Sequence, residues 1–187
     1  MSAAEFRKKF EAEWSLIGAP MPDSLDWKSV YEAKPLGRNL LRNPAPFGTT
    51  APSNTSRWPC RWFSMEQVVD LKAEGLWEEM LDEFQPEIVI QDWYEESQLH
   101  EFIYQLHVKL LGADKSTVIS EHTVNPTEDC SIYSHTWKEV SHVFSSYGPG
   151  VRYVQFLHRL KNSFMVEFFP TLFTGSSVIV RPVKTSS

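Results

Sequence analysis

Alternation between apolar and polar side chains runs through the second half of the chain, and this period of two is the feature that most limits its fold. Residues 104–110 read YQLHVKL, with large apolar side chains at every second position, and residues 139–144 alternate in the same way. Further strand-like runs at 117–124, 151–160 and 176–182 are separated by turn sequences such as YGPG. Strands about ten residues apart, without helices between them, predict a mainly β protein, an antiparallel β-sandwich rather than a parallel α/β sheet.

Short helices are expected before the strands. Apolar residues recur every four positions over 6–14, which predicts a short amphipathic helix, and a second helical piece is expected over 25–32. Neither is long enough to be stable without packing on something larger. Leu36, Leu40 and Leu41 are the expected anchors onto that larger body.

The middle of the chain predicts a loop, an ambiguous segment and one more helix. Residues 43–59 hold four prolines among Gly, Ser, Thr and Asn, which is typical of a long loop or linker. Over 64–74 a capping-box pattern favours a helix, whereas Val68-Val69 favours a strand. An apolar stripe then predicts a short helix at about 75–84 that Pro86 ends. We therefore expect a helical segment over 1–35 and a sandwich over 36–187.

Charge, cysteine content and hydropathy limit the partners and the cellular compartment that are expected for this chain. The chain has 18 Lys+Arg against 24 Asp+Glu, and this acidic balance argues against a nucleic-acid partner. It lacks the long apolar run of a membrane span, and charged residues interrupt its N-terminus where a signal peptide needs apolar ones. Cys60 and Cys130 have no metal-type or CxxC spacing. These features predict a cytoplasmic protein without a membrane span.

A search for catalytic or metal-binding patterns finds none that is convincing, so we expect no enzyme activity, no metal and no cofactor. The pairs His100/His107 and His135/His142 are each seven residues apart, an odd spacing that puts the members of a pair on opposite faces of a strand. Residues 175–177, Gly-Ser-Ser, lie at the start of a predicted strand and are interpreted as a turn rather than as a catalytic motif.

Aromatic residues make up 13% of the chain, and most of them must fill the core. Rings at strand ends are candidates for ligand contact, because loops at the edge of a rigid sandwich often carry binding sites. Asp92, Trp93 and Tyr94 follow an apolar run and precede a polar turn, so they form a possible rim of a binding site. The alternative is that they belong to the folded end of a strand.

Five blocks of sequence, in order, resemble the F-box-associated domain of F-box-only proteins. They read RNLLRNP, VVDLKAEGLWEEMLDEFQPEIVIQDWY, YQLHVKLL, WKEVSHVFSSYGPGVRYVQFLH and SSVIVRP, and they span roughly residues 36 to 182. The resemblance implies a jelly-roll, galactose-binding-like sandwich of two antiparallel sheets with short helices at its margin. It also implies a non-catalytic module that binds a protein or glycoprotein ligand, since this domain reads N-glycans on misfolded glycoproteins for ubiquitin ligases of the SCF type.

The sugar-contacting run of that family, Tyr-Trp-Lys, falls by this resemblance on Phe164, Met165 and Val166. One ring remains, whereas the indole, the phenol hydroxyl and the ammonium group are gone. Aromatic stacking contributes about 0.5–1.5 kcal/mol, but sugar selectivity needs hydrogen bonds that these side chains cannot make. We therefore expect glycan binding to be weakened or lost, and an apolar protein segment to be the more plausible ligand.

The sequence departs from the family in two ways, and the first affects whether the chain can join a ubiquitin ligase. Residues 1–35 do not form a complete F-box, so binding of the Skp1 adaptor is not expected. The segment between RNP and VVDL is shorter than in relatives. The expected function is a recognition domain in ubiquitin-dependent protein degradation. The alternative is a scaffold or regulatory protein, without ligase recruitment, that binds an apolar protein segment.

Overall fold

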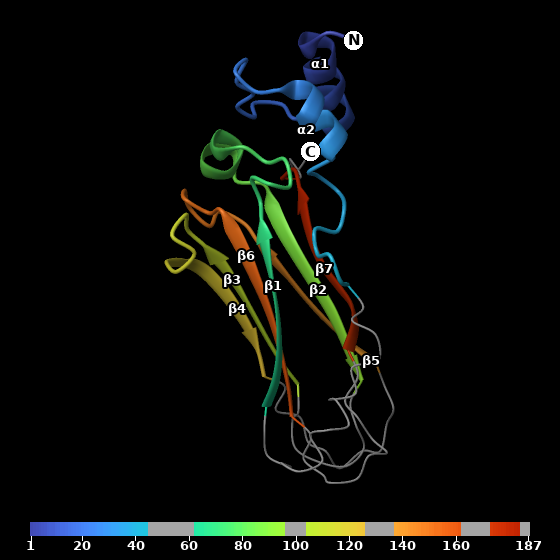
Figure 1. Cartoon of the computed structure of the whole chain (residues 1–187), viewed down its shortest axis with the longest axis vertical. Helices are drawn as coiled ribbons and strands as arrows, with labels where there is room; N and C mark the ends of the chain where they lie inside the picture. The colour runs from blue at the N-terminus through green and yellow to red at the C-terminus, as the bar shows by residue number, and fades with distance from the viewer. Residues whose placement is uncertain (45–61, 96–103, 126–136, 162–172, 184–187) are drawn as a thin grey trace.

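The computed structural model describes residues 1–44, 62–95, 104–125, 137–161 and 173–183, and these form two antiparallel sheets with helices at one end (Figure 1). The four-stranded sheet has the order β1-β6-β3-β4 and the three-stranded sheet the order β5-β2-β7. The predicted antiparallel sandwich is therefore confirmed. The helices are α1 (Ala3–Trp14), α2 (Trp27–Ala33) and the π-type helix η2 (Met80–Phe84). The strands are β1 (Trp62–Asp70), β2 (Glu87–Glu95), β3 (Tyr104–Leu111), β4 (Val118–Val124), β5 (Trp137–Phe144), β6 (Tyr153–Lys161) and β7 (Phe173–Arg181).

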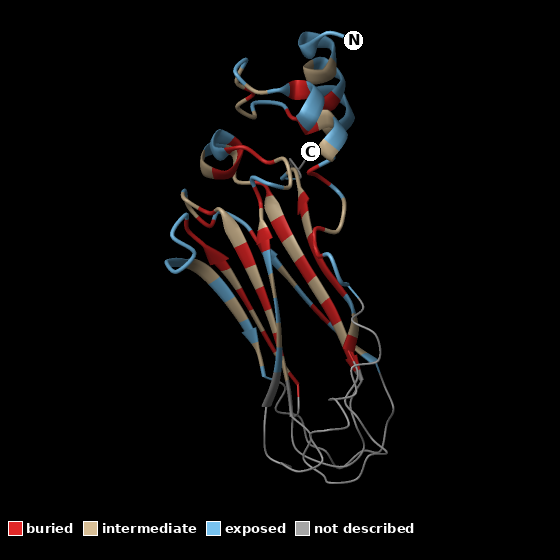
Figure 2. Cartoon of the chain, viewed as in Figure 1, coloured by how far each residue is buried: buried red, intermediate tan, exposed pale blue. Residues whose placement is uncertain are grey.

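The core lies between the two sheets and follows from the alternation in the sequence. Ile88 and Ile90 of β2, Leu106 and Val108 of β3 and Val178 of β7 are all fully buried. Buried and partly exposed residues alternate as bands along β2 and β6 (Figure 2). Burial of each such side chain stabilises the fold by about 1.5–3 kcal/mol, so this shared interior holds the sheets together.

The N-terminal helices pack on one end of the sandwich through aromatic side chains. Phe10 of α1 and Trp27 of α2 are buried against Trp77, and the two indole rings meet edge to face with centroids 5.3 Å apart. The Trp77 indole donates a hydrogen bond to the Pro20 carbonyl at 2.7 Å, and Trp27 donates to Pro22 at 3.0 Å. No helix in the described ranges combines the length and apolar character needed to cross a membrane.

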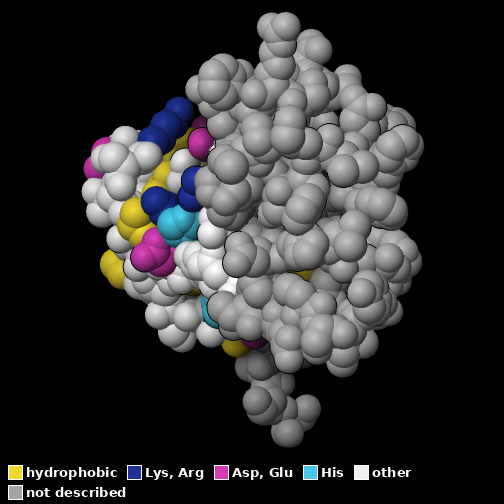
Figure 3. All heavy atoms as spheres, turned by 90° about the horizontal axis from the view of Figure 1, so that it is seen from below, with side chains coloured by type: hydrophobic (Ala, Val, Ile, Leu, Met, Phe, Trp, Pro, Cys, Tyr) yellow, Lys and Arg dark blue, Asp and Glu magenta, His cyan; other side chains and the backbone are white. Residues whose placement is uncertain are grey.

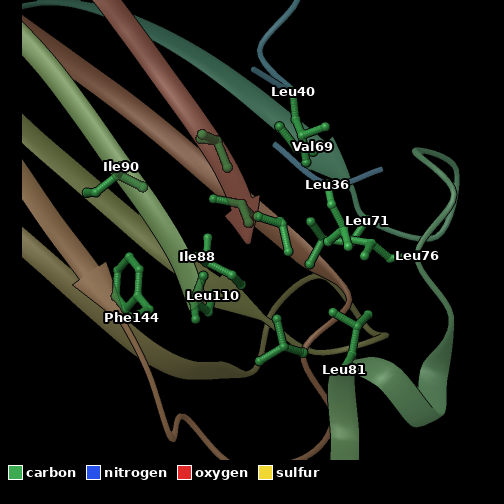
Figure 4. Close-up of a cluster of buried hydrophobic side chains, with 14 of the residues drawn as sticks. Leu36, Leu40, Val69, Leu71, Leu76, Leu81, Ile88, Ile90, Leu110 and Phe144 are labelled. Atoms are coloured by element: carbon green, nitrogen blue, oxygen red, sulfur yellow. The ribbon is translucent and has the colours of Figure 1, made fainter. Parts of the chain in front are cut away.

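The segment after α2 connects these helices to the sandwich. The Gly37 amide donates to the Val180 carbonyl and the Leu40 amide to the Val178 carbonyl, each at 2.8 Å, so the segment lies along the edge of β7. Leu36 and Leu40 are buried, as expected for anchors, beside Leu71 and Leu76 (Figure 4). The helices of 1–35 and the sandwich thus share one core, and the domain boundary at residue 35 stays a prediction.

The segment that gave conflicting signals, 64–74, is a strand up to Asp70 and then a turn. β1 pairs with β6 along its whole length, from Trp62 opposite Lys161 to Asp70 opposite Tyr153. The Gln67 side chain both accepts from the Asn43 amide at 3.1 Å and donates to the Asn43 carbonyl at 2.9 Å. The Gln67 side chain, which the capping-box pattern assigned to a helix cap, therefore binds the segment around Asn43 to the edge of the sheet.

The helix expected near 75–84 is present but begins later, at Glu78, and becomes the π-type helix η2. Gln85 ends it in a left-handed conformation with φ of 52°. The Asp82 carboxylate accepts from the Gly150 amide at 2.8 Å and from both terminal nitrogens of Arg152. These bonds lower the pKa of Asp82, the side-chain hydrogen bonds from Arg152 being the main cause, and attach this helix to the turn before β6.

Two histidines face each other where the sheets meet at β4 and β5. The rings of His122 and His142 stack with centroids 4.0 Å apart and planes 5° apart, and Phe144 meets His142 edge-on. Partial burial lowers the pKa of both imidazoles, and the charge of His142 lowers that of His122 further. Stacking at this distance favours neutral rings, because a proton on either ring would be partly desolvated.

This pair predicts a loss of stability on acidification. The folded state holds both pKa values below the unfolded value of about 6.5, so the unfolded state binds more protons as pH falls through that value. The free energy of unfolding should therefore decrease from pH 7.5 to pH 5.5, until the folded pKa values are passed. Urea unfolding at several pH values should show a shallower decrease for the double variant His122→Phe/His142→Phe, which keeps two rings but cannot be protonated. Equal decreases for the variant and the original chain would contradict the prediction.

Candidate ligand-binding end of the sandwich

The end of the sandwich far from α1 and α2 is the candidate site, and we call it the loop end. It is formed by the last residues of β2, β4 and β6 and the first residues of β1, β3, β5 and β7, at the bottom of Figure 1. Three connections start there in sequence, between β2 and β3, between β4 and β5, and between β6 and β7. Ends of rigid sandwiches are common places for binding sites, because loops can vary there without disturbing the core.

The predicted ligand residues Phe164, Met165 and Val166 lie outside the described residues. They fall in the connection between β6 and β7, and their contact with a ligand stays a prediction.

The predicted rim residues Asp92, Trp93 and Tyr94 are all described, and two of them are buried. β2 continues to Glu95, so Asp92 and Tyr94 keep the inward phase of Ile88 and Ile90 and are 0% and 7% exposed. The expectation of a rim is therefore corrected for these two, and the strand-end alternative describes them. Trp93 points to the opposite face and is partly exposed; a ligand contact of Trp93 stays a prediction.

Four buried polar side chains meet in the interior just behind the loop end, one each from β2, β3, β6 and β7. We call them the interior polar cluster: Asp92, Tyr104, His158 and Ser176. Among the described residues, the Asp92 carboxylate accepts hydrogen bonds from the Tyr104 hydroxyl and, at 2.7 Å, from Ser176 Oγ. His158 Nε2 lies 2.8 Å from Asp92 Oδ2, the oxygen that also accepts from Tyr104, and 3.3 Å from Ser176 Oγ, which donates to Oδ1.

Aromatic rings separate this cluster from solvent. Tyr94 stacks on Tyr104 with centroids 4.4 Å apart, and Phe173 stacks on His158 at 4.2 Å. Burial, together with the nearby Asp92 carboxylate, raises the pKa of Tyr104 well above its usual value. The Tyr104 hydroxyl therefore keeps its proton and remains a donor to Asp92.

A β-bulge brings Ser176 into the cluster. The pairing of β2 with β7 shifts between Gln91 and Trp93, so β7 has one additional residue at the position of Asp92. Gly175 adopts a left-handed conformation there, with φ of 66°, and its backbone lies against the Trp93 indole. The additional residue allows both Ser176 and Phe173, three positions apart, to point inward. Residues 175–177 are therefore part of a strand, and the interpretation of them as a turn is wrong.

The residue types Ser, His and Asp also occur in serine hydrolases, but this geometry does not activate a nucleophile. In a catalytic triad the two ring nitrogens of His contact Ser and Asp separately, whereas Ser176 and Asp92 both contact Nε2 of His158. The Ser176 hydroxyl donates to Asp92 rather than to His158, and its side chain is fully buried. The cluster can hold strands in place, but it cannot reach a substrate. Within the described part of the chain, no three His, Cys, Asp or Glu side chains form a group that could bind a metal.

The outer face of the four-stranded sheet is polar beside the loop end. When the molecule is viewed from below, positively charged, negatively charged and histidine side chains lie close together on the described surface (Figure 3). Pairs across the strands include His107 with Glu121 at 2.9 Å and Gln155 with Glu66 at 3.0 Å. Opposite charges and amides that satisfy one another are typical of a solvated sheet face.

The sequence carried a signal for the cluster that the prediction did not use. Asp92, Tyr104 and His158 each occupy an inward position of an alternating strand, next to fully buried residues such as Ile90, Leu106 and Phe156. A polar side chain at an inward position must find a partner inside. That rule marks Asp92 and His158 as buried and paired, although it does not say with which residues.

Comparison with known proteins is consistent with this fold. The model of the F-box associated region matches residues 51–180. F-box only protein 50 of Danio rerio is 52% identical over 234 aligned positions, covering 98% of this chain and 99% of that protein. F-box only protein 50 of Homo sapiens is 42% identical over 86% of this chain and 68% of its own length, and F-box only protein 6 of Bos taurus is 34% identical over 83% and 69%.

The alignment with the Danio rerio protein is longer than the 187 residues of this chain, so that protein contains residues without a counterpart here. Among solved structures, "Family 16 Carbohydrate Binding Module-2" matches with a TM-score of 0.39 and 11% identity, over 64% of this chain and 70% of that one.

Proposed function

Since the chain belongs to the F-box associated region family, we propose that it is a non-catalytic recognition domain that binds a protein or glycoprotein ligand at the loop end. The observation that carries this proposal is the family match over 51–180, because it includes the strands that border the loop end. The burial of Ser176, His158 and Asp92 supports a binding role over a hydrolytic one. We further propose a cytoplasmic protein that acts in ubiquitin-dependent protein degradation.

The ligand we propose is an apolar segment of an unfolded protein rather than a glycan. Phe164, Met165 and Val166 can bury apolar surface, but their side chains offer no hydrogen bonds to sugar hydroxyls. Burial of one such side chain in a complex contributes about 1.5–3 kcal/mol.

A second candidate, a scaffold without ligase recruitment, is favoured by the packing of the N-terminal helices. An F-box must bury apolar helix surface on the Skp1 adaptor, whereas Phe10 and Trp27 are already buried in the core of this chain. Within residues 1–35, all of them described, Met1 and Ile17 are the large apolar residues that are exposed. We therefore do not expect α1 and α2 to bind Skp1.

One binding experiment tests both candidates. The purified chain is titrated with an unfolded model glycoprotein, with the same protein after enzymatic removal of its high-mannose N-glycans, and with Skp1. We expect similar affinity for both forms of the unfolded protein and no stable complex with Skp1. Binding that disappears when the glycans are removed would contradict the proposed ligand. A stable Skp1 complex would contradict the second candidate, the scaffold without ligase recruitment.

The same titration locates the site. Phe164→Ser/Met165→Ser should weaken binding of the unfolded protein about tenfold or more, because apolar contacts are lost. Val68→Ser, which changes an exposed apolar residue on β1, is the matched control and should bind like the original chain. Equal effects of the two variants would place the binding surface elsewhere.

A further inference from the structure

We infer that Asp92, Tyr104, His158 and Ser176 are positioning residues for the loop end: their hydrogen bonds fix the two sheets relative to each other where the β2–β3 and β6–β7 connections start. This inference rests on the proposed function for its effect on ligand affinity, whereas its structural consequence can be measured without a ligand.

The cluster joins two pairs of neighbouring strands, β2 with β7 and β3 with β6, that lie in different sheets. β2 and β7 belong to the three-stranded sheet, and β3 and β6 belong to the four-stranded sheet. The contacts of Asp92 with Tyr104 and with His158 therefore cross from one sheet to the other. Ser176 connects the same carboxylate to β7. One carboxylate thus joins the strands on both sides of two connections.

The position of each residue in its strand places these contacts at the base of the connections. Tyr104 is the first residue of β3, and Asp92 lies three residues before the end of β2. His158 lies three residues before the end of β6, and Ser176 is the fourth residue of β7. A shift of one sheet against the other at this end would change the spacing of all four strand ends together.

Hydrogen bonds fix position in a way that apolar packing does not. Apolar burial is non-directional, so neighbouring arrangements of two sheets differ little in that contribution. If the sheets shifted, the buried carboxylate would lose a hydrogen bond, and both the carboxylate and the donor would be left unpaired in the interior. A buried network in which every group has a partner therefore specifies one arrangement of the sheets. The bulge at Gly175, which aims both Ser176 and Phe173 inward, is a local deviation of the kind that proteins keep next to functional sites.

The first readout is hydrogen exchange of the chain without ligand. Tyr104→Phe and Ser176→Ala each remove one hydroxyl from the cluster. We expect Tyr104→Phe in β3 to speed exchange in peptides covering the start of β7, and Ser176→Ala in β7 to speed exchange in peptides covering the start of β3, although these strands belong to different sheets. Tyr147→Phe is the matched control, because it removes a buried hydroxyl that donates to the Pro86 carbonyl at 2.9 Å near the opposite end. Faster exchange confined to the altered residue's own sheet, or equal effects of Tyr147→Phe, would overturn the inference.

The second readout is affinity for the unfolded model protein used above. Tyr104→Phe and Ser176→Ala should each weaken binding by about threefold to tenfold, whereas Tyr147→Phe should leave it unchanged. The double variant should lose less binding free energy than the two single variants lose together, because both hydroxyls act through Asp92. If the original chain does not bind the unfolded protein, the proposed function fails, and the exchange readout still decides the positioning role. If binding is intact in both hydroxyl variants, the positioning role in recognition is wrong.

Discussion

Asp92→Ala should lower the free energy of unfolding by about 3–5 kcal/mol, one of the largest losses expected for a single substitution in this chain. The carboxylate is fully buried. Among the described residues, its removal leaves the Tyr104 hydroxyl without a hydrogen-bond acceptor, and leaves His158 and Ser176 with only each other. Each buried donor that loses its acceptor costs about 1–3 kcal/mol, and the small side chain also leaves a cavity.

Urea or guanidinium unfolding followed by fluorescence measures this loss. Asp92→Asn keeps the shape and one acceptor oxygen, so it should cost less than Asp92→Ala. Glu83→Ala changes an exposed acid and should stay within about 0.5 kcal/mol of the original chain. A loss below about 1 kcal/mol for Asp92→Ala would show that water or other groups can satisfy the cluster, contrary to the buried arrangement described above.

Gly37→Ala should lower the free energy of unfolding by about 2–4 kcal/mol, for two separate reasons. Gly37 has φ of 72°, in the left-handed region that an alanine adopts only at a cost. A Cβ at this position would also overlap the Trp14 indole, so the ring that ends α1 would have to move. The substitution therefore disturbs the junction of α1 with the edge segment that carries the Gly37–Val180 hydrogen bond.

Gly18→Ala separates the two contributions. Gly18 has φ of 80°, but a Cβ there would meet no atom within 4 Å, so only the backbone cost of about 1–2 kcal/mol is expected. The difference between the two variants in thermal or urea unfolding measures the contact with Trp14. If Trp14→Leu is added, Gly37→Ala should cost less than it does alone, because the smaller side chain makes room. Identical losses for Gly37→Ala and Gly18→Ala would contradict the close packing of Trp14.

The strands were predictable because their inward side chains are apolar and occur at every second position. The pattern in 104–110 became β3, and the anchors Leu36 and Leu40 are buried. Local sequence patterns predicted secondary structure less well where contacts with residues distant in the sequence decide between helix and strand. Gln67 looked like part of a helix cap, but its amide binds the backbone of Asn43, and the segment is β1.

The alternation marks Asp92 and His158 as buried, but their partners were not predictable from the sequence, because these residues meet only in the folded chain. Asp92 and Ser176 are separated by 84 positions, and a bulge decides that Ser176 points inward. Residues 92–94 could be either a rim or the folded end of a strand by sequence. The strand continues to Glu95, so Asp92 and Tyr94 are buried and Trp93 is partly exposed. The family resemblance located the candidate ligand residues, since no periodicity in 161–170 distinguishes a binding loop from a buried one.

Site-specific photo-cross-linking tests the central claim, recognition of an unfolded protein segment at the loop end, most directly. A photoreactive side chain is placed at position 164, and at position 68 as the control, and each chain is irradiated with the unfolded model protein before and after removal of its N-glycans. We expect cross-links from position 164 with both forms of the protein and few from position 68. Cross-links that need the glycans, or that form equally well from position 68, would contradict it.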